Sequence, residues 1–122
     1  MKKAYEEYSL LYDFYGMLLS DRQREAFELY NEENLSLSET GANLGVSRQA
    51  VHIAVTKACE ELENYEEKLG LIAKNKALEK IKTEIDSKID GTLKDKPRMV
   101  SADPETAKTL RKIKKLVKEF DL

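Results

Sequence analysis

The sequence is poor in the residues that build disulfides, helix breaks and reactive centres. Cysteine occurs once, at Cys59, and histidine once, at His52. A single cysteine excludes an internal disulfide framework and is typical of a protein in the reducing cytoplasm. Glycine occurs five times and proline twice in 122 residues, so helices meet few positions at which they must end. These scarcities favour a helical, cytoplasmic protein.

A strong charge of either sign is also missing. The 21 Lys and Arg residues nearly balance the 23 Asp and Glu residues, and the formal net charge is -2. No global positive field therefore draws the chain towards phosphates, and any basic footprint must be local. We recognise no signal peptide and no apolar run long enough to cross a bilayer, so we expect a cytoplasmic protein without membrane contact.

The patterns of enzymes and metal sites are missing as well. His52 has no evident serine or cysteine nucleophile with a supporting acid around it. Cys59 follows an apolar helical position, which is typical of a partly buried residue rather than of a redox centre. Neither metal-ligand spacing nor a phosphate-binding loop occurs. We therefore predict no catalysis, no metal and no cofactor.

What the sequence does contain is helical periodicity. Lys, Glu, Leu and Ala dominate the periodic stretches, which predicts an all-α fold. In residues 4–19 apolar and aromatic side chains recur at helical spacing, and the tyrosines among them are predicted to lie in the core. Ser20 with Gln23 three residues later has the pattern of a capping box, so a second helix should begin near Asp21. The polar cluster at residues 31–34 should end it.

The stretch "SLSETGANLGVSRQAVH", residues 36–52, has the pattern of two short helices joined by a tight turn. Ser36 and Glu39 repeat the capping-box spacing, which predicts a helix over residues 37–44. Gly45 suits a left-handed turn, because a residue without a Cβ adopts that backbone conformation at little cost.

Ser47 is then the predicted N-cap of a further helix, which begins at Arg48 and meets no breaker before Gly70. A helix-turn-helix also needs a small residue where its two helices touch, and Gly41 or Ala42 can supply it. The apolar anchors of this motif are predicted to be Leu37, Leu44, Val46, Val51 and Val55.

These anchors leave one face of the second helix free to contact a nucleic acid. Arg suits guanine and Gln suits adenine in the major groove, and free amides at a helix N-terminus can bind phosphate oxygens. The predicted DNA-binding residues are Ser36, Ser47, Arg48, Gln49, His52 and Lys57.

Residues 18–69 resemble the YlxM family of helix-turn-helix proteins of Gram-positive bacteria and also the fourth conserved region of sigma factors. The motifs "LSLSE", "GVSRQAVH" and "YEEKL" carry the resemblance, in that order. It implies a cytoplasmic regulatory protein whose gene commonly neighbours those of the signal recognition particle and its receptor. A part in signal recognition particle-dependent protein targeting is thus implied by association and not by a mechanism.

The sequence departs from the pattern of that family in two places. Thr40 and Gly41 stand where relatives tend to have a bulky aliphatic residue followed by Ala, and the glycine costs roughly 1 kcal/mol in helix propensity. After His52, residues 53–56 are apolar or uncharged where polar or basic residues are usual. Because few cations remain on this helix, we expect weak DNA binding unless two copies act together.

The long helix that begins at Arg48 carries apolar residues alternately three and four apart, which is a heptad seam. Such a seam packs either against another helix of its own chain or against a second copy. We predict a homodimer, because two copies would match a two-fold operator. After Val51, the seam residues are Val55, Ala58, Leu62, Tyr65, Leu69 and Ile72.

The chain is predicted to divide into a helix-turn-helix domain, residues 1–70, and a helical C-terminal extension, residues 71–122. The first helix of the extension should end at Gly91, and residues 94–106 predict a loop. The apolar face of this helix is marked by Leu78, Ile81, Ile85 and Ile89.

Asp103 and Pro104 predict the N-cap and first turn of a last helix. Its apolar face is predicted to hold Leu110, Ile113, Val117 and Phe120. The rest of the helix forms the most basic patch of the chain, with Lys108, Arg111, Lys112, Lys114, Lys115 and Lys118. This patch can bind phosphates of DNA or of the signal recognition particle RNA, although a solvated helix face is the commoner meaning of such a run.

Three functions of different classes follow from the sequence. The first is a nucleic-acid-binding regulator that reads DNA through Arg48, Gln49 and His52, and we favour it. The second is a protein-interaction module in which the helix-turn-helix is a scaffold and the apolar Ile53 with the long helix docks a partner, such as a protein of the targeting pathway. The third is an RNA binder that uses the basic C-terminal helix.

Overall fold

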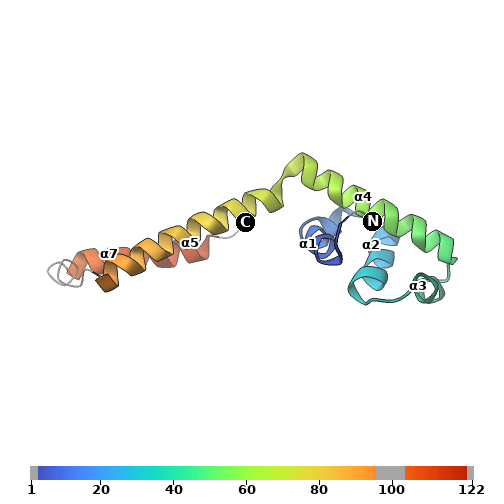
Figure 1. The fold of residues 1–122 in the computed structure, drawn as a ribbon, viewed down its shortest axis with the longest axis horizontal. Coiled ribbons are helices and arrows are strands. Elements are labelled where there is room, and N and C mark those ends of the chain that lie inside the picture. Colours follow the sequence, from blue (N-terminus) through green and yellow to red (C-terminus); the bar gives the residue numbers. More distant parts are fainter. Residues whose placement is uncertain (1–2, 96–103, 121–122) are drawn as a thin grey trace. The chain divides into compact units, whose positions relative to one another are not determined.

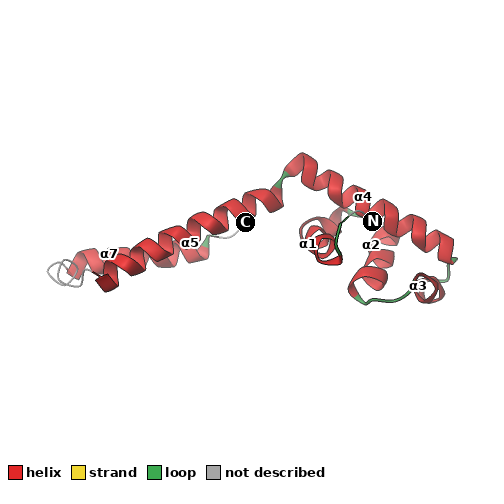
Figure 2. Cartoon of the chain, in the orientation of Figure 1, coloured by secondary structure: helices red, strands yellow, loops and turns green. Residues whose placement is uncertain are grey.

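The structure is a computed structural model that describes residues 3–95 and 104–120. Every regular element in these two ranges is a helix, which confirms the predicted all-α class (Figures 1 and 2). The α-helices in chain order are α1 (Tyr5–Tyr15), α2 (Asp21–Phe27), α3 (Leu37–Leu44), α4 (Arg48–Leu69), α5 (Leu71–Asp95) and α7 (Pro104–Glu119).

The chain forms two compact units, residues 1–72 and residues 73–122. The first unit contains α1 to α4 and the first residues of α5. The second unit contains the rest of α5 together with α7.

The predicted helix boundaries around the helix-turn-helix are confirmed. Ser20 and Ser36 each form a capping box, with Gln23 and Glu39 as the respective partners. Their hydroxyls satisfy backbone N–H groups that the first turn of a helix leaves without an internal acceptor. The short helix α3 therefore begins and ends where its sequence predicts.

The first predicted helix is shorter than expected. It ends at Tyr15 and is followed by a 3₁₀ turn, Gly16–Leu18. The Tyr12 ring covers Gly16 so closely that a Cβ there would lie 2.6 Å from it. α2 runs on into a π-helical turn, Glu28–Glu32, and the polar cluster then ends the helix as predicted.

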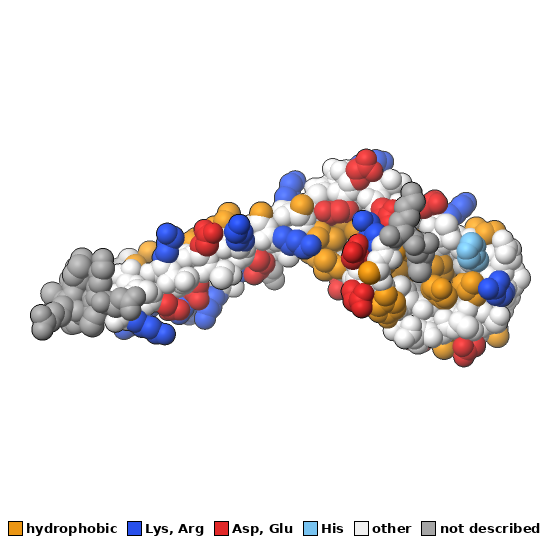
Figure 3. Space-filling view, viewed as in Figure 1, with side chains coloured by type: hydrophobic (Ala, Val, Ile, Leu, Met, Phe, Trp, Pro, Cys, Tyr) orange, Lys and Arg blue, Asp and Glu red, His pale blue; other side chains and the backbone are white. Residues whose placement is uncertain are grey.

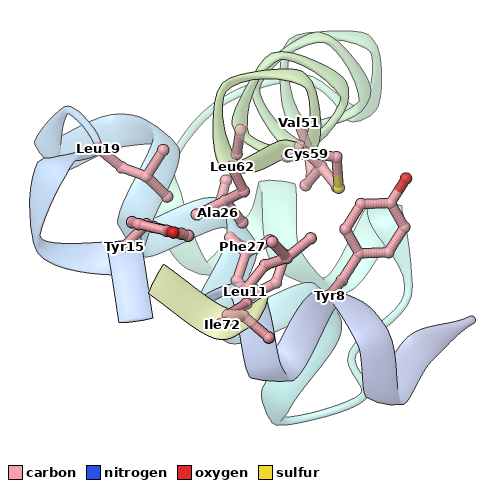
Figure 4. Packing of buried hydrophobic residues seen from close by; sticks show 12 residues of the cluster. Tyr8, Leu11, Tyr15, Leu19, Ala26, Phe27, Val51, Cys59, Leu62 and Ile72 are labelled. Atoms are coloured by element: carbon pink, nitrogen blue, oxygen red, sulfur yellow. The ribbon is translucent and has the colours of Figure 1, made fainter. Parts of the chain in front are cut away.

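One apolar core holds the first unit together. Phe27 of α2 lies in its middle, close to Leu11 of α1 and Leu62 of α4 (Figure 4). The Tyr12 ring stacks on Phe27 with 4.9 Å between ring centroids. The other buried members are Tyr8, Tyr15, Leu19, Ala26, Val51, Val55, Ala58, Cys59 and Ile72. The prediction that the tyrosines of the first helix form core is thus confirmed for Tyr8 and Tyr15.

Tyrosine hydroxyls on α1 tie the helix to acidic side chains across the core. The Tyr8 hydroxyl donates to Glu63 of α4 over 2.6 Å, and the Tyr15 hydroxyl donates to Glu66 one turn further on. Burial first, and then the hydrogen bond to Glu66, raise the pKa of Tyr15. Because of these bonds, each aromatic ring can be buried while its hydroxyl keeps a hydrogen-bond acceptor.

The start of α5 is anchored within the first unit. Gly70 takes the left-handed conformation, with φ of 63°, and ends α4. The next two backbone N–H groups then donate to side chains, Leu71 to the Tyr15 hydroxyl over 3.1 Å and Ile72 to Glu66 over 3.0 Å. Two amides that a helix N-terminus leaves unsatisfied thereby gain acceptors.

In the second unit the prediction that Gly91 ends its helix is wrong. α5 continues through Gly91 to Asp95. A glycine inside a helix costs only about 1 kcal/mol relative to alanine, so it ends a helix only where a left-handed turn is also needed. In the described residues, the glycines with positive φ are Gly45 and Gly70.

The apolar face predicted for the last helix is correct only in part. Leu110 and Val117 are half-buried, but Ile113 and Phe120 are exposed. The face that packs on α5 instead includes Ala107, which is buried, and Lys114. Pro104 begins the helix as predicted, whereas the predicted N-cap Asp103 and most of the predicted loop lie outside the described residues.

Candidate nucleic-acid interface

Gly41 is the small residue at which α3 and α4 meet. A Cβ on Gly41 would lie 2.7 Å from the Val46 carbonyl oxygen, and the Val46 N–H donates to the Gly41 carbonyl over 2.9 Å. Ala42, the alternative that the sequence left open, is exposed. Gly45 makes the turn with φ of 71°. The backbone crossing of the two helices therefore depends on a residue without a side chain.

The apolar anchors set which face of α4 is free. Val51 and Val55 are buried in the core. Partly buried anchors pack against the same cluster, namely Leu37, Leu44 and Val46. Because side chains three and four apart share one helix face, this arrangement turns the opposite face of the first three turns of α4 outward.

All the residues predicted to bind DNA are exposed: Ser36, Ser47, Arg48, Gln49, His52 and Lys57. The Ser47 hydroxyl caps α4 by accepting from the Ala50 N–H over 3.0 Å, and Ser36 caps α3 in the same way. A hydroxyl that accepts through its oxygen keeps its own O–H for donation, so both serines can still donate to a phosphate. Ile53, half-exposed on the same face, adds an apolar contact surface.

A groove of about 300 Å³ runs beside this face of α4. Its lining consists of Tyr30, Leu37, His52, Val55 and Thr56. The sequence analysis did not assign Tyr30 or Thr56 to the site. Their proximity depends on how α2 and its π-helical turn pack across α4, which no local sequence pattern encodes.

The charge of the first unit is uneven. Residues 1–72 contain 14 acidic and 7 basic side chains, yet residues 40–59 contain no Asp or Glu and include Arg48 and Lys57. In Figure 3 the histidine at the end of this unit that holds α3 and the start of α4 lies among hydrophobic and basic side chains, with an acidic side chain at the lower edge. Acidic side chains elsewhere on the unit repel a polyanion. The repulsion is therefore weakest at the end that holds the start of α4.

The heptad seam of α4 packs within its own chain. Val55, Ala58, Leu62 and Ile72 are buried in the core of the first unit, and Tyr65 packs against that core. Leu69 is exposed. A second copy could not use the buried part of this seam without opening the core.

The basic patch of α7 is smaller than predicted. Lys114 faces α5, where its ammonium lies 2.6 Å from a carboxylate oxygen of Asp90 and 3.9 Å from one of Asp86. The hydrogen bond lowers the pKa of Asp90 and raises the pKa of Lys114. The other members are exposed: Lys108, Arg111, Lys112, Lys115 and Lys118. Residues 73–122 contain 14 basic and 9 acidic side chains, the reverse of the first unit.

The single cysteine is a core residue. Burial, followed by the charge of Glu63, raises the pKa of the Cys59 thiol to about 11. The thiol is therefore protonated at neutral pH and is a weak nucleophile. In residues 3–95 and 104–120 no cluster of side chains fits a metal ion, and no helix there has the length and apolarity needed to cross a membrane.

Comparison with known proteins agrees with this architecture. Residues 2–100 match the family UPF0122, described as "Putative helix-turn-helix protein, YlxM / p13 like". A UPF0122 protein of Caldanaerobacter subterraneus is 53% identical over 78 residues, which is 61% of this chain and 67% of that protein. A UPF0122 protein of a Thermoanaerobacter species is 39% identical over 118 residues, covering 93% of each chain. One from Acetivibrio thermocellus is 39% identical over 125 residues, 98% of this chain and 97% of the relative.

Proposed function

The chain belongs to the UPF0122 family of YlxM-like helix-turn-helix proteins, and on this premise we propose that it is a cytoplasmic regulator that binds duplex DNA. The domain of residues 1–70 would place the N-terminal half of α4 in the major groove. The single observation that carries the proposal is the outward face at the start of α4, free of acidic residues in an otherwise acidic unit.

Each exposed residue of that face has a distinct role in the proposal. Arg48 and Gln49 lie in the first turn of α4, where side chains of a recognition helix reach base edges, guanine for Arg and adenine for Gln. His52 lies one turn further along. Ser36 and Ser47, with the amides at the two helix N-termini, bind phosphates and fix the register, and Lys57 adds a phosphate contact.

The proposed binding is weak for a single copy. Two cations, Arg48 and Lys57, contact phosphates or bases in this arrangement. Each neutralised phosphate contributes about -0.9 to the slope of log K against log salt, so one copy should show a slope of roughly -2. Two copies on a two-fold operator would double the contacts and the slope.

Titration of the full chain with duplex DNA at several salt concentrations tests the proposal. Arg48→Ala should weaken binding and reduce the magnitude of the salt slope by about 1 per copy. Arg22→Ala is the matched control, because it removes an equal charge from an exposed position of α2 outside the interface. An equal loss in both variants would mean that binding follows net charge alone and would contradict the proposed interface.

A second candidate function rests on the basic surplus of the second unit. The exposed basic residues of α7 can bind the phosphates of a structured RNA, and the signal recognition particle RNA is the candidate that the gene neighbourhood of the family implies. The double variant Lys112→Ala and Lys115→Ala should then lose RNA binding that Arg48→Ala retains. If the chain binds neither DNA nor RNA, a scaffold for protein contacts through Ile53 is left as the function.

A further inference from the structure

The first unit carries an apolar patch that nothing in its own fold covers. Its members are Met17, Leu18, Leu69 and Leu71, with exposed fractions of 90%, 54%, 45% and 39%. We call these four residues the leucine patch. They come from the 3₁₀ turn after α1, the end of α4 and the start of α5.

Leu18 and Leu71 lie next to a pair of tyrosine rings, and Met17 precedes Leu18 in the 3₁₀ turn. The Tyr15 and Tyr65 ring centroids lie 5.9 Å apart. The Tyr65 hydroxyl donates to the Leu18 carbonyl over 3.4 Å, and the Leu71 N–H donates to the Tyr15 hydroxyl over 3.1 Å. Leu69 lies one turn after Tyr65 on α4. These bonds bring the three segments that carry the patch together, and exposed apolar side chains gathered in this way are typical of an interaction site.

The second unit carries an apolar surface of its own on α7. Ile113, Leu116 and Phe120 are 40%, 65% and 55% exposed. Their spacing places them on one side of the helix, and we call them the α7 stripe. Among the described residues of this unit, the buried apolar side chains are those of Ile89 and Ala107. Two helices alone leave the α7 stripe without a covering layer.

The two surfaces sit in opposite electrostatic surroundings. The leucine patch belongs to a unit with 14 acidic and 7 basic side chains, and next to it on α4 the exposed Glu67 is followed by one lysine, Lys68. The α7 stripe belongs to a unit with 14 basic and 9 acidic side chains. The exposed basic side chains of α7 adjoin the stripe. Each surface thus has the charge that would attract the other.

We propose that two copies of this chain pair reciprocally, with the α7 stripe of each copy packed on the leucine patch of the other. The pairing is isologous, so a two-fold axis buries both patches and both stripes at once. Two equal contacts also double the buried surface area. A single three-residue stripe would bury too little area for a stable interface. This inference does not depend on nucleic-acid binding. It also differs from a dimer through the α4 seam, because most of that seam, Val55, Ala58, Leu62 and Ile72, is buried within its own chain.

The full chain should sediment at twice its mass of 14.0 kDa at equilibrium. Because opposite charges surround the two apolar surfaces, the dimer dissociation constant should rise at least fivefold between about 0.1 and 1 M salt, as the Debye length falls from roughly 10 to 3 Å. A dimer held only by apolar contacts would not weaken in this way. A monomer at all concentrations would overturn the proposal.

Leu116→Glu and Leu18→Lys should each raise the dimer dissociation constant at least about tenfold, because each change occurs twice in a two-fold dimer. Ile81→Glu is the matched control, since Ile81 is an exposed apolar residue of the second unit outside the α7 stripe. All three sites are exposed, and an unchanged helical circular dichroism spectrum shows that each variant folds.

Mixing the two variants gives the sharpest test. A heterodimer of Leu116→Glu with Leu18→Lys contains one unaltered contact and one contact with an introduced ion pair, so the mixture should form more dimer than either variant alone. Failure of the mixture to restore dimer would contradict the reciprocal contact. Binding of the monomer to vesicles of anionic phosphatidylglycerol, lost in Leu116→Glu, would instead assign the α7 stripe to a membrane surface and overturn the proposal.

Discussion

The two units of this protein use similar helices in opposite ways. The first surrounds Phe27 with apolar side chains from several helices and carries an acidic surface. The second consists of α7 on α5, carries a basic surface and leaves Ile113, Leu116 and Phe120 exposed. An amphipathic sequence therefore does not determine burial by itself. Burial requires enough helices to enclose the apolar face.

Truncation of a large apolar side chain should show the largest difference in stability between the two units. Phe27→Ala should lower the free energy of unfolding of the first unit by about 3–5 kcal/mol, because it removes the central side chain and leaves a cavity. The matched change in the second unit, Ile81→Ala, should alter stability by less than about 0.5 kcal/mol, because Ile81 is exposed and lies outside the α7 stripe. Chemical denaturation followed by circular dichroism measures both, and equal losses would contradict the difference in packing.

Substitution at the helix crossing should have the next largest effect. Gly41→Ala places a methyl group 2.7 Å from the Val46 carbonyl oxygen, so the backbone must shift, at a cost of about 1–3 kcal/mol. Ala42→Ser, at the exposed neighbouring position, is the control and should change stability little. Thermal unfolding of the two variants tests which residue forms the contact between α3 and α4.

Alkaline pH should destabilise the first unit through Tyr15. Its folded-state pKa is raised above the usual 10.0 by burial and by the bond to Glu66. The contribution to stability is complete below the unfolded-state pKa and is lost as pH rises through the raised folded-state value. Denaturation at pH values on both sides of about 10 should show this loss, and Tyr15→Phe should make it smaller. An unchanged pH slope in Tyr15→Phe would contradict the assignment.

The smallest effect should come from the half-buried ion pair of the second unit, Lys114 with Asp90. Lys114 lowers the pKa of Asp90, so the contribution of Asp90 is present above the unfolded-state pKa and is lost as pH falls through the lowered folded-state value. Asp90→Asn should therefore speed amide exchange along α7 at neutral pH and leave the amides of α1 to α4 unchanged. Equal exchange in α7 of both proteins would show that the pair contributes nothing.

Local chemistry predicted most helix ends correctly. Ser20, Ser36 and Ser47 are predicted N-caps, Gly45 a predicted left-handed turn and Gly70 a predicted helix breaker, because each effect acts within a few residues. The end of α1 at Tyr15 was not predicted, since the contact of Gly16 with the Tyr12 ring follows from packing.

Features that depend on contacts between residues far apart in the chain could not be predicted from the sequence. Lys114 is indistinguishable from its lysine neighbours until Asp90 is placed opposite it. Gly91 and Gly70 are both glycines, but Gly91 lies inside α5, which continues beyond it. In the candidate interface, the exposed face of α4 could be predicted from periodicity, whereas the groove beside His52 could not, because Tyr30 reaches it from another helix.

Amide chemical-shift mapping of the isotope-labelled full chain with duplex DNA tests the proposed interface most directly. The account predicts that chemical-shift changes are concentrated at residues 36–57, around the capped start of α4. These changes should become smaller as salt is added. Shifts confined to residues 104–119, with the start of α4 unaffected, would contradict it.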